Sequence, residues 1–92
     1  MPRPLVLAQL VERVSLSVAA SALNRDRANE AEARERQAYA DISAHYMQQA
    51  NGYRGRAALL VVRASKQQLG RWFASRNLAV RRFVIEHVHL RA

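Results

Sequence analysis

The apolar positions near the start of the chain recur with a helical period. Five apolar residues recur there, and each has another of the five three or four positions away, which places them on one stripe of a helix. They are Leu7, Leu10, Val11, Val14 and Val18. Pro4 suits the first turn of such a helix, because its missing N–H has no partner there in any case. The local alternation over residues 14–18 would also fit a strand, but the longer pattern favours a helix.

A second helix is predicted over residues 28–50, where good helix formers follow one another without glycine or proline. Asn24 or Asp26 would cap its start, since short polar side chains accept hydrogen bonds from the free N–H groups of a helix end. The Asn-Gly pair that opens residues 51–56 would end it. These residues are therefore expected to form a loop between the two halves of the chain.

The second half of the chain is ambiguous between helix and strand. The apolar run within residues 57–63 is rich in valine and leucine and fits either a buried strand or a core helix. Ser65 is expected to cap a helix over residues 66–73, and the alternation over residues 80–90 favours a strand. We therefore predict a helix-dominated α+β fold, in which a long N-terminal helix or helix pair packs on a strand–helix–strand unit. The alternative is an all-α fold.

The length and composition of the chain indicate one folded domain over residues 1–92. Half of the residues are apolar, which is enough for folding, but 17 of them are alanines, which bury little surface. Ala-rich amphipathic helices often complete their core against a second copy, so residues 5–50 are also a candidate homodimer interface. No stretch approaches the eighteen apolar residues or so of a membrane span. We expect a cytoplasmic protein that does not contact membranes.

The residue types needed for catalysis or metal binding are scarce. The chain has no cysteine, which excludes disulfide bonds, thiolate zinc sites and cysteine nucleophiles. His87 and His89 would share one face of a strand, but no third ligand accompanies them, and we expect no metal site. There is no Ser-His-Asp arrangement, glycine-rich phosphate loop or closely spaced pair of carboxylates on a recognisable scaffold. The sequence thus predicts neither an enzyme nor a cofactor.

Charge divides the chain into two unlike halves. Residues 1–53 hold six basic and six acidic residues, whereas residues 54–92 hold nine basic residues and one acidic residue, Glu86. The whole net charge of +8 therefore lies in the second half. An excess of this size attracts phosphate groups strongly. We interpret residues 1–53 as a neutral helical scaffold and residues 54–92 as a basic half that binds a polyanion.

The candidate contacts to this polyanion come from the basic half and its border. The candidate nucleic-acid-binding residues are Arg54, Arg56, Arg63, Lys66, Arg71, Arg76, Asn77, Arg81 and Arg82. Tyr53 and Trp72 are candidates for stacking on bases, because aromatic rings supply such platforms in single-strand-binding proteins. In the expected loop, an arginine–glycine segment beside Tyr53 could wrap a phosphate.

Residues 69–83 carry apolar and small residues at the spacing of a known motif, namely Leu69, Gly70, Phe73, Ala74 and Val80. In this spacing the segment resembles the helix-turn-helix of bacterial transcription regulators. The resemblance implies that Arg76, Asn77, Arg81 and Arg82 project from a second helix that reads bases in the major groove. Two positions depart from the motif, which usually has alanine in place of Gly70 and glycine in place of Ala74.

A strand over residues 80–90 would remove this second helix, and the strand is the interpretation that we favour. We therefore expect the basic half to follow the phosphate backbone without reading the sequence. The predicted function is that of a small basic nucleic-acid-binding protein, a candidate regulator. The alternative is a small phage- or plasmid-type inhibitor that binds an acidic or nucleic-acid-binding surface of a larger complex.

Overall fold

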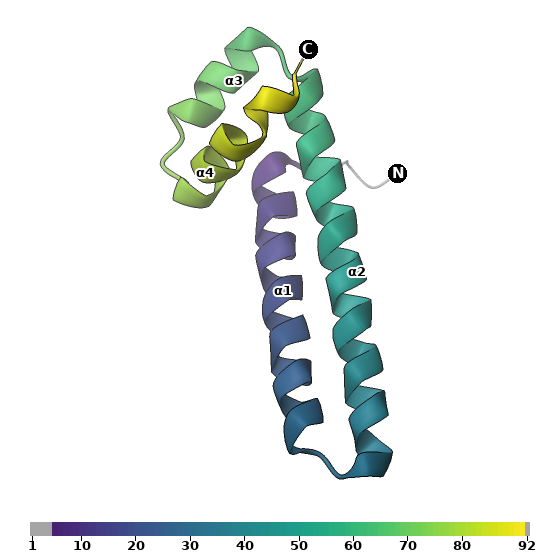
Figure 1. Ribbon diagram of the computed structural model, residues 1–92. Coiled ribbons are helices and arrows are strands. Elements are labelled where there is room, and N and C mark those ends of the chain that lie inside the picture. Colours follow the sequence, from purple (N-terminus) through teal and green to yellow (C-terminus); the bar gives the residue numbers. More distant parts are fainter. Residues whose placement is uncertain (1–4, 92) are drawn as a thin grey trace.

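The computed structural model describes residues 5–91, which form four α-helices and one 3-10 turn. These elements are α1 (Leu7–Glu30), α2 (Ala33–Arg63), α3 (Lys66–Phe73), α4 (Leu78–His87) and η1 (Val88–Leu90). In Figure 1, α1 and α2 form a long antiparallel hairpin, and α3 and α4 fold across the end where α1 begins and α2 ends. We call this end, with α3 and α4, the head.

Residues 5–91 contain no strand, so the predicted α+β fold is wrong and the alternative, an all-α fold, is correct. In the segment expected as a strand, Val80, Phe83 and Val84 are buried. These steps of three and one are helical, and the alternation over residues 80–90 is a coincidence of a short segment. The apolar run within residues 57–63 likewise forms the last two turns of α2.

The two long helices differ in their bounds from those predicted. α1 continues to Glu30, so Asn24 and Asp26 lie inside it and cap nothing. α2 passes through the expected loop at residues 51–56 without a break. The reason is packing: Ala50 and Ala57, one on each side of the expected loop, are fully buried, and tertiary burial outweighs the poor helix propensity of glycine. The helix capped by Ser65 is confirmed, since the Ser65 Oγ accepts a hydrogen bond of 3.1 Å from the Gln68 N–H.

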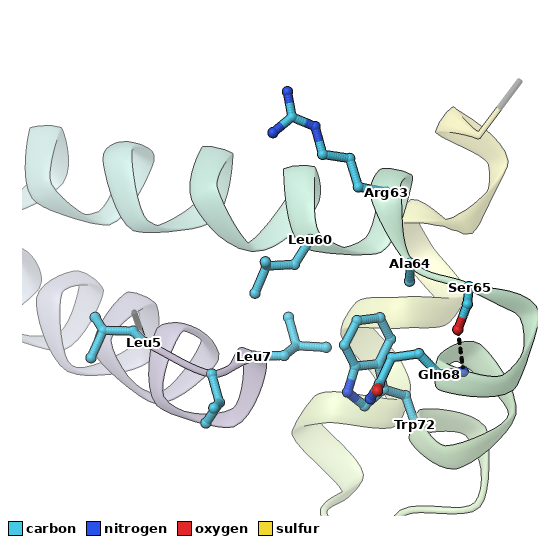
Figure 2. Close-up of a pocket in the computed structure, with 9 residues that line it drawn as sticks. Leu5, Leu7, Leu60, Arg63, Ala64, Ser65, Gln68 and Trp72 are labelled. Carbon is cyan, nitrogen blue, oxygen red and sulfur yellow. Dashed lines mark hydrogen bonds between the residues drawn. The ribbon is translucent and has the colours of Figure 1, made fainter. Parts of the chain in front are cut away.

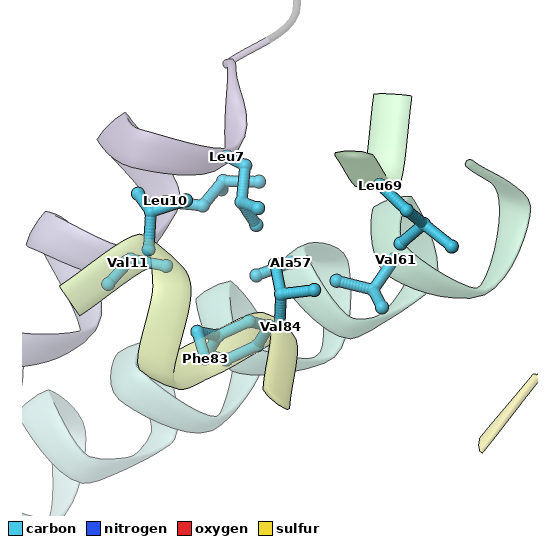
Figure 3. Packing of buried hydrophobic residues seen from close by; sticks show 9 residues of the cluster. Leu7, Leu10, Val11, Ala57, Val61, Leu69, Phe83 and Val84 are labelled. Atoms are coloured by element: carbon cyan, nitrogen blue, oxygen red, sulfur yellow. The ribbon is translucent and has the colours of Figure 1, made fainter. Parts of the chain in front are cut away.

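The large buried side chains gather in the head, as Figure 3 shows. The cluster consists of Leu7, Leu10 and Val11 from α1, Ala57 and Val61 from α2, Leu69 from α3, and Val80, Phe83 and Val84 from α4. Three residues of the apolar stripe predicted near the N-terminus thus belong to this core. All four helices contribute to it, and the core therefore fixes α3 and α4 on the end of the hairpin.

Away from the head, α1 and α2 meet along a seam of small residues. Its centre is a pair of buried serines: the Ser21 Oγ donates to the Ser43 carbonyl oxygen at 2.9 Å, and the Ser43 Oγ donates to the Ser21 carbonyl oxygen at 2.8 Å. Both hydroxyls are therefore satisfied although they are buried. The predicted homodimer through residues 5–50 stays a prediction. The exposed apolar residues in this range are Val6, Leu16, Val18, Leu23 and Ile42.

The molecule is elongated, with principal extents of 53 × 29 × 24 Å. Among the helices within residues 5–91, none is long and apolar enough to cross a membrane.

Candidate nucleic-acid interface

α4 is fixed at its start by a cap and along its inner side by the core. The Asn77 Oδ1 accepts hydrogen bonds from the N–H groups of Ala79 and Val80, at 3.1 and 3.2 Å. Val80, Phe83 and Val84 point into the core of the head. The opposite side of α4 therefore faces solvent.

The solvent side of α4 combines apolar and basic side chains. One surface depression of about 330 Å³ is lined by Leu78, Arg81, Arg82, Ile85 and Glu86. Leu78 is 69% exposed and Ile85 62%, and the two side chains line this depression together. They lie seven residues apart, with the two arginines between them in the sequence. This side of α4 thus offers two cations and two apolar contacts.

A groove between α4 and the hairpin brings two more distant residues together. Arg54 of α2 and Arg82 of α4 both line a cavity of about 250 Å³, beside Glu86 of α4 and Val11 and other residues of α1. Arg54 is half-buried, and its Nη1 donates to the Asn51 Oδ1 at 3.0 Å, which orients the guanidinium. Two guanidinium groups from separate helices at one groove form a natural position for a phosphate.

His87 lines the same groove and belongs to the residues that sequence reasoning missed as part of this surface. Its ring stacks on Phe83, with 3.9 Å between the ring centroids, and its Nδ1 lies 2.8 Å from the Phe83 carbonyl oxygen. Because that carbonyl can only accept, the Nδ1 carries the proton. Residues four apart on a helix are neighbours, so a helix prediction for residues 80–90 would have indicated the contact between Phe83 and His87. The strand prediction did not indicate it.

Tyr53 and Arg56 lie on α2 and not in a loop. The guanidinium carbons of Arg13 and Arg56 lie 5.6 and 5.8 Å from the centroid of the Tyr53 ring, within cation–π distance. The Arg13 Nη1 also donates to the Tyr53 Oη at 3.4 Å. Tyr53 is half-buried and packs against the core. Its ring already contacts Arg13 and Arg56 of the protein itself.

Trp72 forms a wall of an apolar groove, shown in Figure 2. This groove has a volume of about 650 Å³, and its apolar lining includes Leu5, Leu7 and Leu60. Arg63 lies at its edge, and in Figure 2 the Arg63 side chain points away from the leucines. The structure therefore places Trp72 and Arg63 away from the groove that Arg54 and Arg82 share.

The remaining predicted residues are spread over the head. Lys66 begins α3, Arg71 lies on its exposed side, and Arg76 is exposed in the turn before α4. Asn77 is the N-cap of α4, so its side-chain oxygen is already used. The structure thus places Arg82 beside Arg54 at the groove and beside Arg81 at the depression on the solvent side of α4, and we call these three residues the basic face.

One arginine of the basic half has a structural role. The Arg91 Nη1 lies 2.8 Å from the Val61 carbonyl oxygen, 3.1 Å from that of Val62 and 2.6 Å from that of Ala64. Carbonyl groups at the end of a helix lack partners within the helix. Arg91 satisfies them and ties the end of the chain to the end of α2.

Comparisons with known proteins add no further assignment: no family model, no curated protein and no solved structure matches the chain.

Proposed function

We propose that the protein binds nucleic acid through the basic face, with phosphate contacts from Arg54 and Arg82. The observation that carries this proposal is the groove between α4 and the hairpin, which both Arg54 and Arg82 line. Arginine binds phosphate well because its planar guanidinium donates two parallel hydrogen bonds. Arg81 extends the basic face onto the solvent side of α4.

The charge of the surrounding chain supports the same proposal. Glu86, which lines the same groove, is the only acidic residue in residues 54–92, against nine basic residues, so the head keeps a large positive excess. Arg56, Lys66, Arg71 and Arg76 are exposed and add to that potential without lining the groove. Charges of one sign raise the rate and strength of association with a polyanion. Their number also makes binding sensitive to salt.

The test is the salt dependence of binding, measured by fluorescence anisotropy with labelled duplex DNA, single-stranded DNA and RNA. Each neutralised phosphate on duplex DNA contributes about −0.9 to the slope of log K against log salt. We expect Arg54→Gln and Arg82→Gln each to reduce the steepness of this slope by roughly one unit. Arg34→Gln, which removes an exposed arginine of α2 far from the head, is the matched control. Absence of binding by the unaltered protein at ~50 mM salt would refute the proposal.

A second candidate function is that of an inhibitor or interaction protein with a protein partner. The apolar groove beside Trp72 favours it, because phosphate binding has no use for such a surface. Leu60→Glu changes a partly exposed side chain of this groove. If a protein partner is captured from lysate after nuclease treatment, we expect Leu60→Glu to weaken that capture and to leave DNA binding unchanged.

A further inference from the structure

The α3–α4 unit has the dimensions of a helix-turn-helix. α3 has 8 residues and α4 has 10, and the segment between them runs from Ala74 to Asn77. In helix-turn-helix units, two short helices are joined by a turn of about three or four residues. The strand predicted over residues 80–90, which was incompatible with a second helix, is not formed; these residues lie in α4 and η1.

The burial of side chains in the α3–α4 unit also agrees with that of a helix-turn-helix. Leu69 and Val80, two apolar positions of the motif, are buried in the core of the head together with Phe83. Phe73 departs from it, because 42% of its surface is exposed. The end of α2 supplies the supporting helix: Ala57 and Val61 pack in the same core, and only Ala64 and Ser65 separate α2 from α3.

The solvent-facing side of the α3–α4 unit also agrees with a helix-turn-helix. The exposed residues before and along α4 include Arg76, Leu78, Arg81, Arg82 and Ile85, and also Asn77, Ala79 and Glu86. A helix is about 10–12 Å wide with its side chains, and the major groove of B-DNA is about 12 Å wide. α4 can therefore enter a major groove with this side against the base pairs.

We propose that α4 enters the major groove of duplex DNA and reads its sequence. Arg81 is assigned to guanine, whose O6 and N7 accept two hydrogen bonds from one guanidinium. Leu78 and Ile85 are assigned to thymine methyl groups, because apolar side chains make such contacts in the major groove. This assignment gives a role to two exposed apolar side chains that phosphate binding leaves unexplained.

Two other residues receive different roles. Arg82 shares its groove with Arg54, so these two residues hold the phosphates that flank α4. Asn77 is not a base-reading residue, because its Oδ1 already accepts from the N–H groups of Ala79 and Val80. This inference rests on the proposed function and names duplex DNA as the nucleic acid.

The experiment selects binding sites for the full chain from a pool of random duplexes and then compares variants on the selected duplex and on a scrambled one. We expect an enriched sequence that contains guanine. Arg81→Ala, Leu78→Ala and Ile85→Ala should each weaken binding of the selected duplex, by about 5- to 150-fold for Arg81→Ala. They should change binding of the scrambled duplex little. All three residues are exposed, so the variants should stay folded.

Two matched controls accompany these variants. Arg54→Ala removes a phosphate contact and should weaken both duplexes equally. Leu16→Ala removes an exposed leucine of α1 outside the head and should weaken neither.

The outcomes separate this inference from the proposed function. Duplex binding without any enriched sequence would overturn the reading of bases by α4 and leave the phosphate contacts standing. Uniform losses on both duplexes for all variants would do the same. Preference for single-stranded DNA or RNA would overturn the inference as well, and absence of all binding would remove both proposals.

Discussion

Asn77 and Arg91 fix the ends of two helices in the head. Asn77 caps the start of α4 through its side-chain oxygen, and Arg91 binds the carbonyl groups at the end of α2. From the sequence, Asn77 was a candidate base contact and Arg91 added to the positive charge of the second half. Both residue types suit either role, and only the position of each side chain relative to a helix end separates the two.

For Asn77, we expect the substitution Asn77→Ala to lower the free energy of unfolding by about 1 kcal/mol, because two N–H groups of α4 lose their partner. Asn77→Ser retains a capping oxygen and should stay close to the unaltered protein. Urea denaturation followed by circular dichroism measures both. A normal stability of Asn77→Ser combined with a loss of affinity on the selected duplex would show that Asn77 contacts a base after all.

For Arg91, we expect Arg91→Ala to lower the free energy of unfolding by about 1–3 kcal/mol, because carbonyl groups at the end of α2 lose a charged donor. Arg91→Lys keeps the charge and should recover part of this loss. Arg71→Ala, at an exposed position of α3, is the control and should change stability by less than about 0.5 kcal/mol. Equal stabilities of Arg91→Ala and Arg71→Ala would contradict the structural role of Arg91.

At the scale of elements, α2 shows how packing overrides local preference. It contains Gly52 and Gly55, and its Asn-Gly pair is typical of a helix end, yet the helix continues through both. None of the glycines in α2 and α3 has a positive φ. A Cβ atom built on Gly52, Gly55 or Gly70 would meet no neighbouring atom within 4 Å. Nothing in the structure therefore requires glycine at these positions.

We accordingly expect Gly52→Ala, Gly55→Ala and Gly70→Ala each to raise the free energy of unfolding by roughly 0.5–1 kcal/mol, because alanine loses less backbone entropy in a helix. Thermal and urea unfolding measure the change. Ala38→Gly, at an exposed position of α2, is the reverse control and should lower stability by a similar amount. A loss of stability in Gly52→Ala or Gly55→Ala would indicate that the helix opens there in solution.

Some of these elements could be predicted from the sequence, and others could not. The apolar stripe that includes Leu7 and Leu10 and the helix capped by Ser65 were predictable, because each has a periodic or capping signal in its own segment. Residues 80–90 were mistaken for a strand, because a short run rich in valine can alternate by chance. The basic face could not be predicted, since Arg54 and Arg82 meet only when α2 and α4 pack together.

At the scale of the whole molecule, the two ends of the hairpin are held by different means. The head contains the cluster of large apolar side chains, whereas the rest of the hairpin is held by small residues around Ser21 and Ser43. Burial of large apolar groups supplies most of the free energy that resists local opening. The part of the hairpin that lies far from the head should therefore open more readily.

We expect amide hydrogen exchange to report this difference. Amides near the turn between α1 and α2 should exchange faster than those near Val61 and Val84, because fewer large buried side chains hold them. Exchange measured by NMR under native conditions tests this. Equal protection along the hairpin, increasing with protein concentration, would instead show that a second copy covers it, as the predicted homodimer through residues 5–50 requires.

The elongated shape sets the length of DNA that one bound molecule protects. The longest extent of the protein is 53 Å, which corresponds to about 15 base pairs at 3.4 Å per pair, whereas α4 alone spans about 15 Å, or four to five base pairs. The length of a nuclease footprint on the selected duplex therefore shows whether the hairpin lies along the DNA axis or points away from it. A protected stretch of about 15 base pairs places α1 and α2 along the double helix, and one confined to about a single groove places them pointing away from it.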